Sequence, residues 1–136
     1  MVLLDCTIIG DIMIDIIVRE KVGNPRLVFG GTSYCSSAKV EFGGAGNVAV
    51  GLSTLGGKAA FIGKAGNDIL GRLYIRDLRK RRVFPRVFFD ETCSTGVDMI
   101  FLNHENERSF LVFRGANDRM SSNEIEKASC EIKKST

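Results

Sequence analysis

The chain has 136 residues, of which 44% are hydrophobic and 26% charged, with 15 glycines and a formal net charge of +3. These values are typical of one globular domain that is rich in turns, and they exclude a disordered tail. No stretch approaches the roughly 20 apolar residues that span a bilayer, so we expect no membrane partner.

The four cysteines lack the spacing of a redox pair or a metal site. Cys6, Cys35, Cys93 and Cys130 are widely separated, and the chain has only one histidine. The first residues, MVLLDCTIIGD, have neither the basic segment nor the long apolar run of a secretory leader. We therefore expect a cytoplasmic protein with no bound metal, whose thiols are reduced and mostly buried.

A cluster of basic side chains lies between residues 76 and 82, in the sequence RDLRKRR. The cluster ends a predicted helix, where cations complement the helix dipole and stay solvated. This position favours an ordinary helix end over a nucleic-acid surface. We expect no nucleic-acid partner.

The first third of the chain predicts strands. Residues 3–9 form a compact apolar run, typical of a central strand, that ends at Gly10 and Asp11. Residues 12–19 predict a second, less buried strand, before the breaker Gly23-Asn24-Pro25. Residues 26–42 fit either two short strands or one bent strand that runs into a glycine turn.

Helices and strands alternate in the next part. A helix is expected over residues 47–55, a short buried strand over 59–62, and a second helix from the N-cap Asp68 to about Arg82. A strand is expected at 86–89, a hairpin at 97–102 and 109–113, and a last helix from Ser121 to about Lys133. This order favours a parallel α/β sheet, with the early extended segment and the hairpin as a separate antiparallel piece.

The glycine turn from Gly43 to Gly46 removes side chains from the backbone where a helix must begin. A small ligand can then approach bare N–H groups at the positive end of that helix. The pattern G-x-G-x-x-A from Gly44 also fits a relaxed dinucleotide fingerprint, which requires an acidic residue at the end of the next strand. Gly63-Lys64 stands at that position instead. The turn therefore indicates a ligand other than a dinucleotide, and no P-loop pattern is present.

Two carboxylates follow the first predicted strand. Asp11 and Asp15 lie at the strand end where ligands bind in open α/β sheets. Asp11 is equally suited to capping a turn. Asp15 lies in an otherwise apolar run, where an ionised carboxylate is costly without a partner, and sugar hydroxyls would supply such partners.

Five segments, in order and spacing, resemble the amino-terminal half of the ribokinase/PfkB family of carbohydrate kinases. They are GDIMID from Gly10, FGGAGNVAVGLSTLGG from Phe42, FIGKAGNDILG from Phe61, STGVDMIFLN from Ser94 and RGAN from Arg114. The resemblance runs from Leu4 to about Lys133. Its first two segments look closest to heptose-phosphate kinases, whereas the hairpin and RGAN look more like ribokinase. Nucleoside, ribose, fructose and heptose phosphate all stay open as substrates.

The resemblance implies a partial ribokinase-like α/β/α sandwich with a small antiparallel β lid, whose strands lie at about 12–42 and 97–113. It also implies a substrate site in which Asp15 binds sugar hydroxyls over a glycine floor, with lid residues facing the sugar. Asp98 replaces the usual apolar lid residue, and Met13 stands where ribokinases commonly have a sugar-binding asparagine. The complete set is Asp11, Met13, Asp15, Gly43, Gly44, Asn47, Asp98, Ile100 and Val112.

The family's catalytic aspartate, anion hole and ATP site belong to its carboxyl-terminal half. We therefore expect no catalytic residue among residues 1–136, and a catalytically incomplete sugar-binding portion of an ATP- and Mg²⁺-dependent kinase. The alternative is a non-catalytic module or subunit that binds a sugar or a nucleoside. A homodimer through the lid or an exposed sheet edge is a further expectation.

Overall fold

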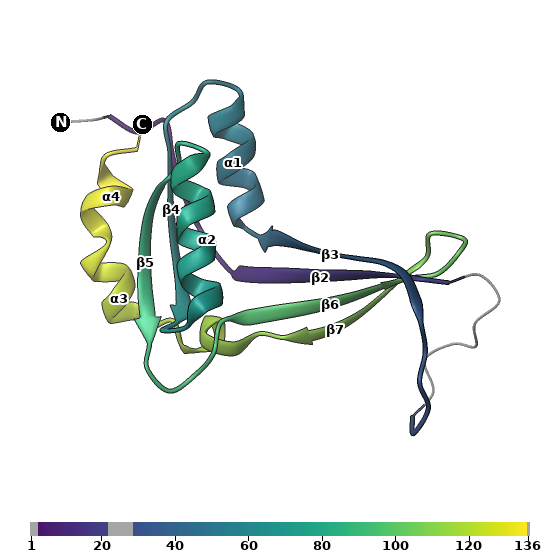
Figure 1. Cartoon of the computed structure of the whole chain (residues 1–136). Coiled ribbons are helices and arrows are strands. Elements are labelled where there is room, and N and C mark those ends of the chain that lie inside the picture. Colours follow the sequence, from purple (N-terminus) through teal and green to yellow (C-terminus); the bar gives the residue numbers. More distant parts are fainter. Residues whose placement is uncertain (1–2, 22–28, 136) are drawn as a thin grey trace.

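The structure is a computed structural model that describes residues 3–21 and 29–135. It has two parts: a layer of strands covered by helices, and a second sheet that projects away from that layer (Figure 1). A three-stranded parallel sheet in the order β1-β4-β5 forms the first part. Its strands are β1 (Cys6–Ile9), β4 (Ala59–Gly66) and β5 (Phe84–Asp90).

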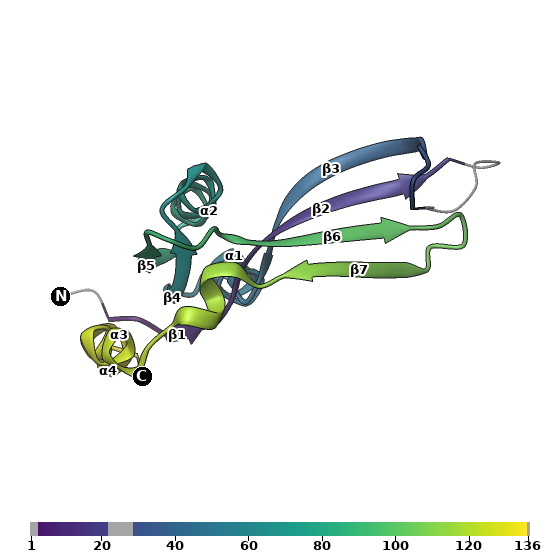
Figure 2. The ribbon, with the colours of Figure 1, turned by 90° about the horizontal axis from the view of Figure 1, so that it is seen from below.

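Helices cover both faces of the parallel sheet. Helices α1 (Gly46–Thr54) and α2 (Ile69–Lys80) lie on one side, and α3 (Ser122–Lys127) and α4 (Ser129–Lys133) on the other (Figures 1 and 2). A short 3₁₀ helix, η1 (Gly115–Arg119), precedes α3. This arrangement confirms the predicted α/β/α sandwich.

Strand β4 is the centre of the core. Its sequence AAFIGKAG is apolar except for Lys64, whose ammonium group donates a hydrogen bond to Glu124 at 2.9 Å. All eight residues are buried, as expected of a parallel strand covered on both faces. Phe61 packs there against Tyr74 of α2, with ring centroids 6.1 Å apart. Helix α2 begins where predicted, because the side chain of Asp68 accepts a hydrogen bond from the Gly71 N–H at 2.9 Å.

The second sheet has four strands in the order β3-β2-β6-β7. They are β2 (Ile12–Glu20), β3 (Cys35–Gly44), β6 (Gly96–Leu102) and β7 (Arg108–Phe113). The two outer pairs are antiparallel, as expected, but the central pair of β2 and β6 is parallel. The reason is that both strands leave the α/β layers in the same direction (Figure 1). That this sheet acts as a lid stays a prediction.

Several predicted boundaries were wrong. The first strand lies at the edge of the described three-stranded sheet, because β4 takes the central position. Gly43 and Gly44 belong to β3, and the glycine turn is reduced to Ala45 before α1. The last helix is interrupted at Ala128, whose N–H is shared between the carbonyls of Glu124 and Ile125. A hydrogen bond to the carbonyl three residues earlier, as in a 3₁₀ helix, tightens the last turn of a helix and ends it.

The extended segment predicted at 26–42 is one strand from Cys35 in the described residues, and residues 22–28 lie outside them. The prediction of mostly buried thiols was wrong, since Cys6, Cys35 and Cys130 are exposed and only Cys93 is partly covered. Cys6 and Cys35 each begin a strand at the edge of a sheet, where one side stays open. The basic cluster is the exposed end of α2, as predicted. None of the helices in the described residues has the length and apolar character of a membrane span.

Candidate functional site

The register of the second sheet aligns three carboxylates across three strands. Asp15 on β2 lies opposite Glu41 on β3 and beside Asp98 on β6. Asp98 in turn lies opposite Val112 on β7. Because residues that are paired across strands share a face, these side chains form a line over the sheet. We call Glu41, Asp15 and Asp98 the carboxylate row.

Other predicted site residues lie on the same face, two residues away along their strands. Met13 pairs with Gly43 on one side and with Gly96 on the other. Ile100 lies two residues beyond Asp98, next to Ile17. The structure therefore brings together six of the predicted residues, and their role in binding stays a prediction. The six are Met13, Asp15, Gly43, Asp98, Ile100 and Val112.

Gly43 is required by its neighbours on both sides of the strand. A Cβ atom at this position would overlap the carboxylate of Asp15. From the α2 side, the Tyr74 hydroxyl donates a hydrogen bond to the Gly43 carbonyl at 2.7 Å. Burial raises the pKa of Tyr74 well above its usual range, so this hydroxyl stays a donor. The missing side chain of Gly43 therefore leaves room for the carboxylate of Asp15.

Neighbouring negative charges in the carboxylate row make ionisation of Asp15 less favourable. Burial raises the pKa of Asp15 above its usual value, and the negative charges of Asp98 and Glu41 raise it further. Glu41 has a cationic partner, Lys39, at 2.6 Å. Asp15 and Asp98 have none within the described residues. One carboxylate oxygen of Asp98, Oδ1, is buried without a hydrogen-bond partner there, which is costly unless a ligand supplies a donor.

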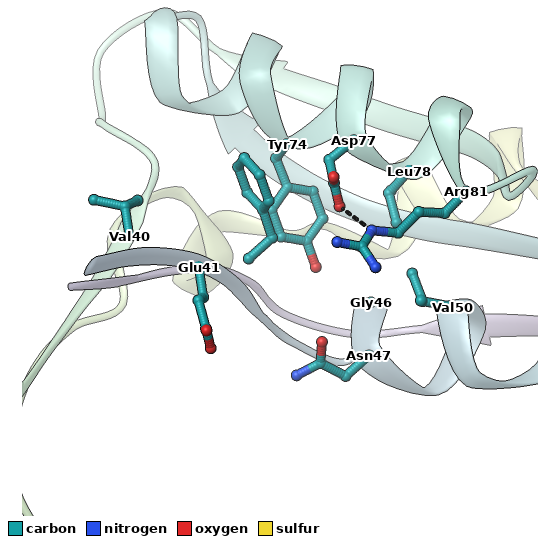
Figure 3. A pocket seen from close by; sticks show the side chains of 10 residues that line it. Val40, Glu41, Gly46, Asn47, Val50, Tyr74, Asp77, Leu78 and Arg81 are labelled. Atoms are coloured by element: carbon teal, nitrogen blue, oxygen red, sulfur yellow. Dashed lines mark hydrogen bonds and ion pairs between the residues drawn. The ribbon is translucent and has the colours of Figure 1, made fainter. Parts of the chain in front are cut away.

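The other three predicted residues lie where β2 begins, where β3 ends and where α1 begins. Gly44 pairs with Ile12 and has a φ of 69°, and a Cβ there would collide with the carbonyl of Asp11. Gly44 therefore serves the turn into α1. Asp11 accepts hydrogen bonds from Arg114 at 2.7 and 3.2 Å, which makes it one half of an exposed ion pair. Asn47 lies in the first turn of α1, and its side chain points to the same side of β3 as Glu41 (Figure 3).

A hollow of about 400 Å³ lies between β3, α1 and α2, and Figure 3 shows the side chains that line it. Asn47 and Glu41 lie at its edge, and Arg81 donates a hydrogen bond to Asp77 at 2.8 Å on its α2 side. A second hollow, of about 610 Å³, lies at the far end of the four-stranded sheet near His104. Neither is lined by Asp15 or Asp98.

Sequence reasoning missed Glu41 and Asn117. Glu41 stands two residues before Gly43 in one strand, so the period of two would have placed it on the face of Asp15. Asn117 is buried, and its side chain accepts a hydrogen bond from the Ile12 N–H at 2.8 Å and donates one to the Ile12 carbonyl at 2.9 Å. It fixes the point where β2 begins. Its RGAN motif marked the residue without indicating this contact.

The row does not form a metal site. Within residues 3–21 and 29–135, no group of three or more histidine, cysteine or acidic side chains could hold a metal ion. The carboxylates stand side by side on separate strands instead of converging on one point. The residues present therefore do not fit the Mg²⁺ that the resemblance implies.

Comparison with known proteins gives a consistent result. A family model described as pfkB family carbohydrate kinase matches residues 4–136. A deoxyribokinase of Salmonella typhi is 32% identical over 133 residues, which are 96% of this chain and 42% of the relative. A probable fructokinase-2 of Arabidopsis thaliana is 33% identical over 109 residues, covering 77% of this chain and 30% of the relative. The chain spans less than half the length of these relatives.

Solved structures show the same fold. A ribokinase from Giardia lamblia matches with a TM-score of 0.84 at 20% identity, covering 96% of this chain and 42% of that one. An adenosine kinase from Sinorhizobium meliloti matches with a TM-score of 0.73 at 28% identity, covering 94% of this chain and 44% of that one. Both solved proteins therefore share this fold, and the shared part is 42% of one solved chain and 44% of the other.

Proposed function

The chain belongs to the pfkB family of carbohydrate kinases, and we propose that it forms the acceptor-binding part of an enzyme that phosphorylates a hydroxyl of a sugar or nucleoside with ATP. The chain spans 30% to 42% of its deoxyribokinase and fructokinase relatives, so the activity of the whole enzyme is part of the proposal. The similar proteins include a probable fructokinase, a deoxyribokinase and an adenosine kinase, and this supports a sugar or nucleoside acceptor.

The observation that carries the proposal is the gathering of the predicted residues on one sheet face around Asp15. A carboxylate accepts hydrogen bonds from two neighbouring hydroxyls, and Gly43 lets a sugar ring approach the strand. Asn47 adds a donor and an acceptor from the same side of β3. Ile100 and Val112 supply the apolar contacts that sugar-ring carbons need.

The residues of this chain would bind and orient the acceptor hydroxyl, and the second sheet would exclude water from it. When bound, ATP supplies the phosphoryl group. The described residues do not fit a Mg²⁺ site. We therefore assign binding and positioning to this segment, and no transfer step.

A thermal-shift screen of ribose, 2-deoxyribose, fructose and adenosine against the 136-residue chain tests binding. A ligand in hundredfold excess over its dissociation constant should stabilise the fold by roughly 2.7 kcal/mol. Asp15→Asn should abolish the shift, because the amide replaces one acceptor by a donor. Glu126→Gln, which changes an exposed acid on α3, is the matched control. An unchanged shift with Asp15→Asn would contradict the proposal.

A coupled assay with ATP tests whether the segment is catalytically incomplete. We expect no sugar-dependent turnover by the purified chain, and robust turnover would refute that part of the proposal. The reading frame distinguishes an enzyme segment from a non-catalytic binding module. Translation that continues past Thr136 into a G-x-G-D motif would favour the enzyme, and a stop codon would favour the module.

A further inference from the structure

The carboxylate row presents acceptors along a line. Neighbouring strands lie about 4.8 Å apart, so the three carboxylates spread over on the order of 10 Å. The described residues offer no convergent metal site. A molecule with several adjacent hydroxyls matches such a line better than a single ion does. The carboxylate of Asp98 lies beside that of Asp15 and adds a second acceptor group to the line.

The row carries little compensating positive charge. Among the described residues, Lys39 forms an ion pair with the row, through Glu41, and the two side chains are 61% and 52% exposed. Three carboxylates and one ammonium leave a charge of −2 when all are ionised. Arg19 lies four residues from Asp15 along β2, which is about 13 Å and beyond a Debye length of about 8 Å at physiological salt. Arg108 lies equally far from Asp98, opposite Leu102.

We infer that Glu41 and Asp98 restrict this face to uncharged polyols and exclude sugars that carry a phosphate. The inference rests on the proposed function, because it concerns what the same face accepts. A phosphate brings close to two negative charges and requires arginine, lysine or backbone N–H donors. On this face it would instead meet three carboxylates. A neutral sugar supplies hydroxyl donors to the carboxylates of Asp15 and Asp98.

The experiment compares matched pairs by calorimetric titration of the 136-residue chain: ribose with ribose 5-phosphate, and fructose with fructose 6-phosphate. We expect the neutral sugar to bind more tightly by on the order of tenfold in low salt. About 0.5 M salt should narrow that ratio by screening the repulsion. A merely structural role of the two acids would produce no such salt dependence.

Single variants identify the residues responsible. Glu41→Gln and Asp98→Asn should each raise the affinity for the phosphate relative to the neutral sugar by several-fold, on the order of one removed charge interaction. Glu126→Gln removes the same charge from α3 and should leave the ratio unchanged. The urea midpoint of each variant shows that it is folded before its binding is compared.

Two failures are distinguishable. If a sugar phosphate binds as tightly as its neutral partner, or if both variants leave the ratio unchanged, the inference is overturned and the proposed function stands. If neither member of any pair binds, the proposed function is overturned, and the inference with it. The inference is supported if the neutral sugar binds more tightly than its phosphate. The ratio of the two affinities must also fall at high salt and in both variants.

Discussion

The two sheets differ in what covers them. All eight residues of β4 are buried between helix layers, whereas all six residues of β7 are exposed. The second sheet joins the core only at its base, where Ile12 and Ile14 are buried. Stability therefore resides in the α/β layers, and the second sheet is a surface held at one end. The difference separates residues that make the fold from residues available to a ligand.

The largest loss of stability should come from a substitution in the core of the α/β layers. Phe61→Ala should lower the free energy of unfolding by about 3 to 5 kcal/mol, because it opens a cavity beside Tyr74 at a fully buried position. Phe110→Ala on β7 removes the same side chain where it is 55% exposed, and should cost less than about 0.5 kcal/mol. Urea unfolding measures both. Equal losses would mean that the second sheet contributes to the core after all.

An intermediate loss of stability is expected near the place where Tyr74 of α2 contacts Gly43 of the second sheet. Gly46→Ala places a Cβ against the buried hydroxyl of Tyr74, and should cost about 1 to 3 kcal/mol. Tyr74→Phe removes that hydroxyl and its hydrogen bond to Gly43. In the Tyr74→Phe background Gly46→Ala should cost clearly less, and a double-mutant cycle by urea unfolding measures this coupling. Additive losses would show that the hydroxyl is not what Gly46 accommodates.

Asp68 belongs to the α/β layers, where its charge is stabilised. Burial alone would raise its pKa, but hydrogen bonds from Gly71 and Thr95 outweigh this and hold the pKa below its usual value of 3.8. Its stabilisation is therefore present above pH 3.8 and is lost as the pH falls through the lower folded pKa. Asp68→Ala should cost about 1 kcal/mol at pH 7, because it removes the N-cap of α2. Urea midpoints against pH should show the difference shrinking in acid.

For Asp15, on the second sheet, we expect stability to depend on pH in the opposite direction. Its substitution should change the stability least. Its pKa is raised above 3.8, so the fold is favoured below that pH and loses stability as the carboxyl ionises. Asp15→Asn should therefore stabilise the chain at pH 7, by a few tenths to about 1 kcal/mol, the range for like charges opposite each other in a sheet. The gain should vanish in acid. A destabilised variant at pH 7 would mean that Asp15 has a structural partner.

The sequence predicted the covered region well because its signals are local. Asp68 followed by apolar residues at helical spacing specifies α2, and the small apolar run around Phe61 specifies β4. The edge position of β1 and the parallel pairing of β2 with β6 depend on which strands meet, and no local pattern encodes that. The predicted strand over 59–62 is too short, because β4 continues to Gly66, and the missing side chains of Gly63 and Gly66 make room for close neighbours.

The candidate site was predicted in part, again because some of its signals are local. Met13, Asp15 and Gly43 were identified from motifs, and the register confirmed that they share a face. Glu41 was overlooked because it lies in a segment that was assigned no fixed strand. The ion pair of Asp11 with Arg114 joins residues 103 positions apart. Such a contact cannot be predicted from spacing.

Asn117 has a consequence for the order in which the protein forms. Its side chain offers Ile12 the same donor and acceptor that a strand backbone would, from a residue 105 positions later in the chain. The beginning of β2 therefore lacks this partner until most of the segment has left the ribosome. We expect β4 with α1 and α2 to form first during synthesis, and the second sheet to be fixed in place only when η1 arrives.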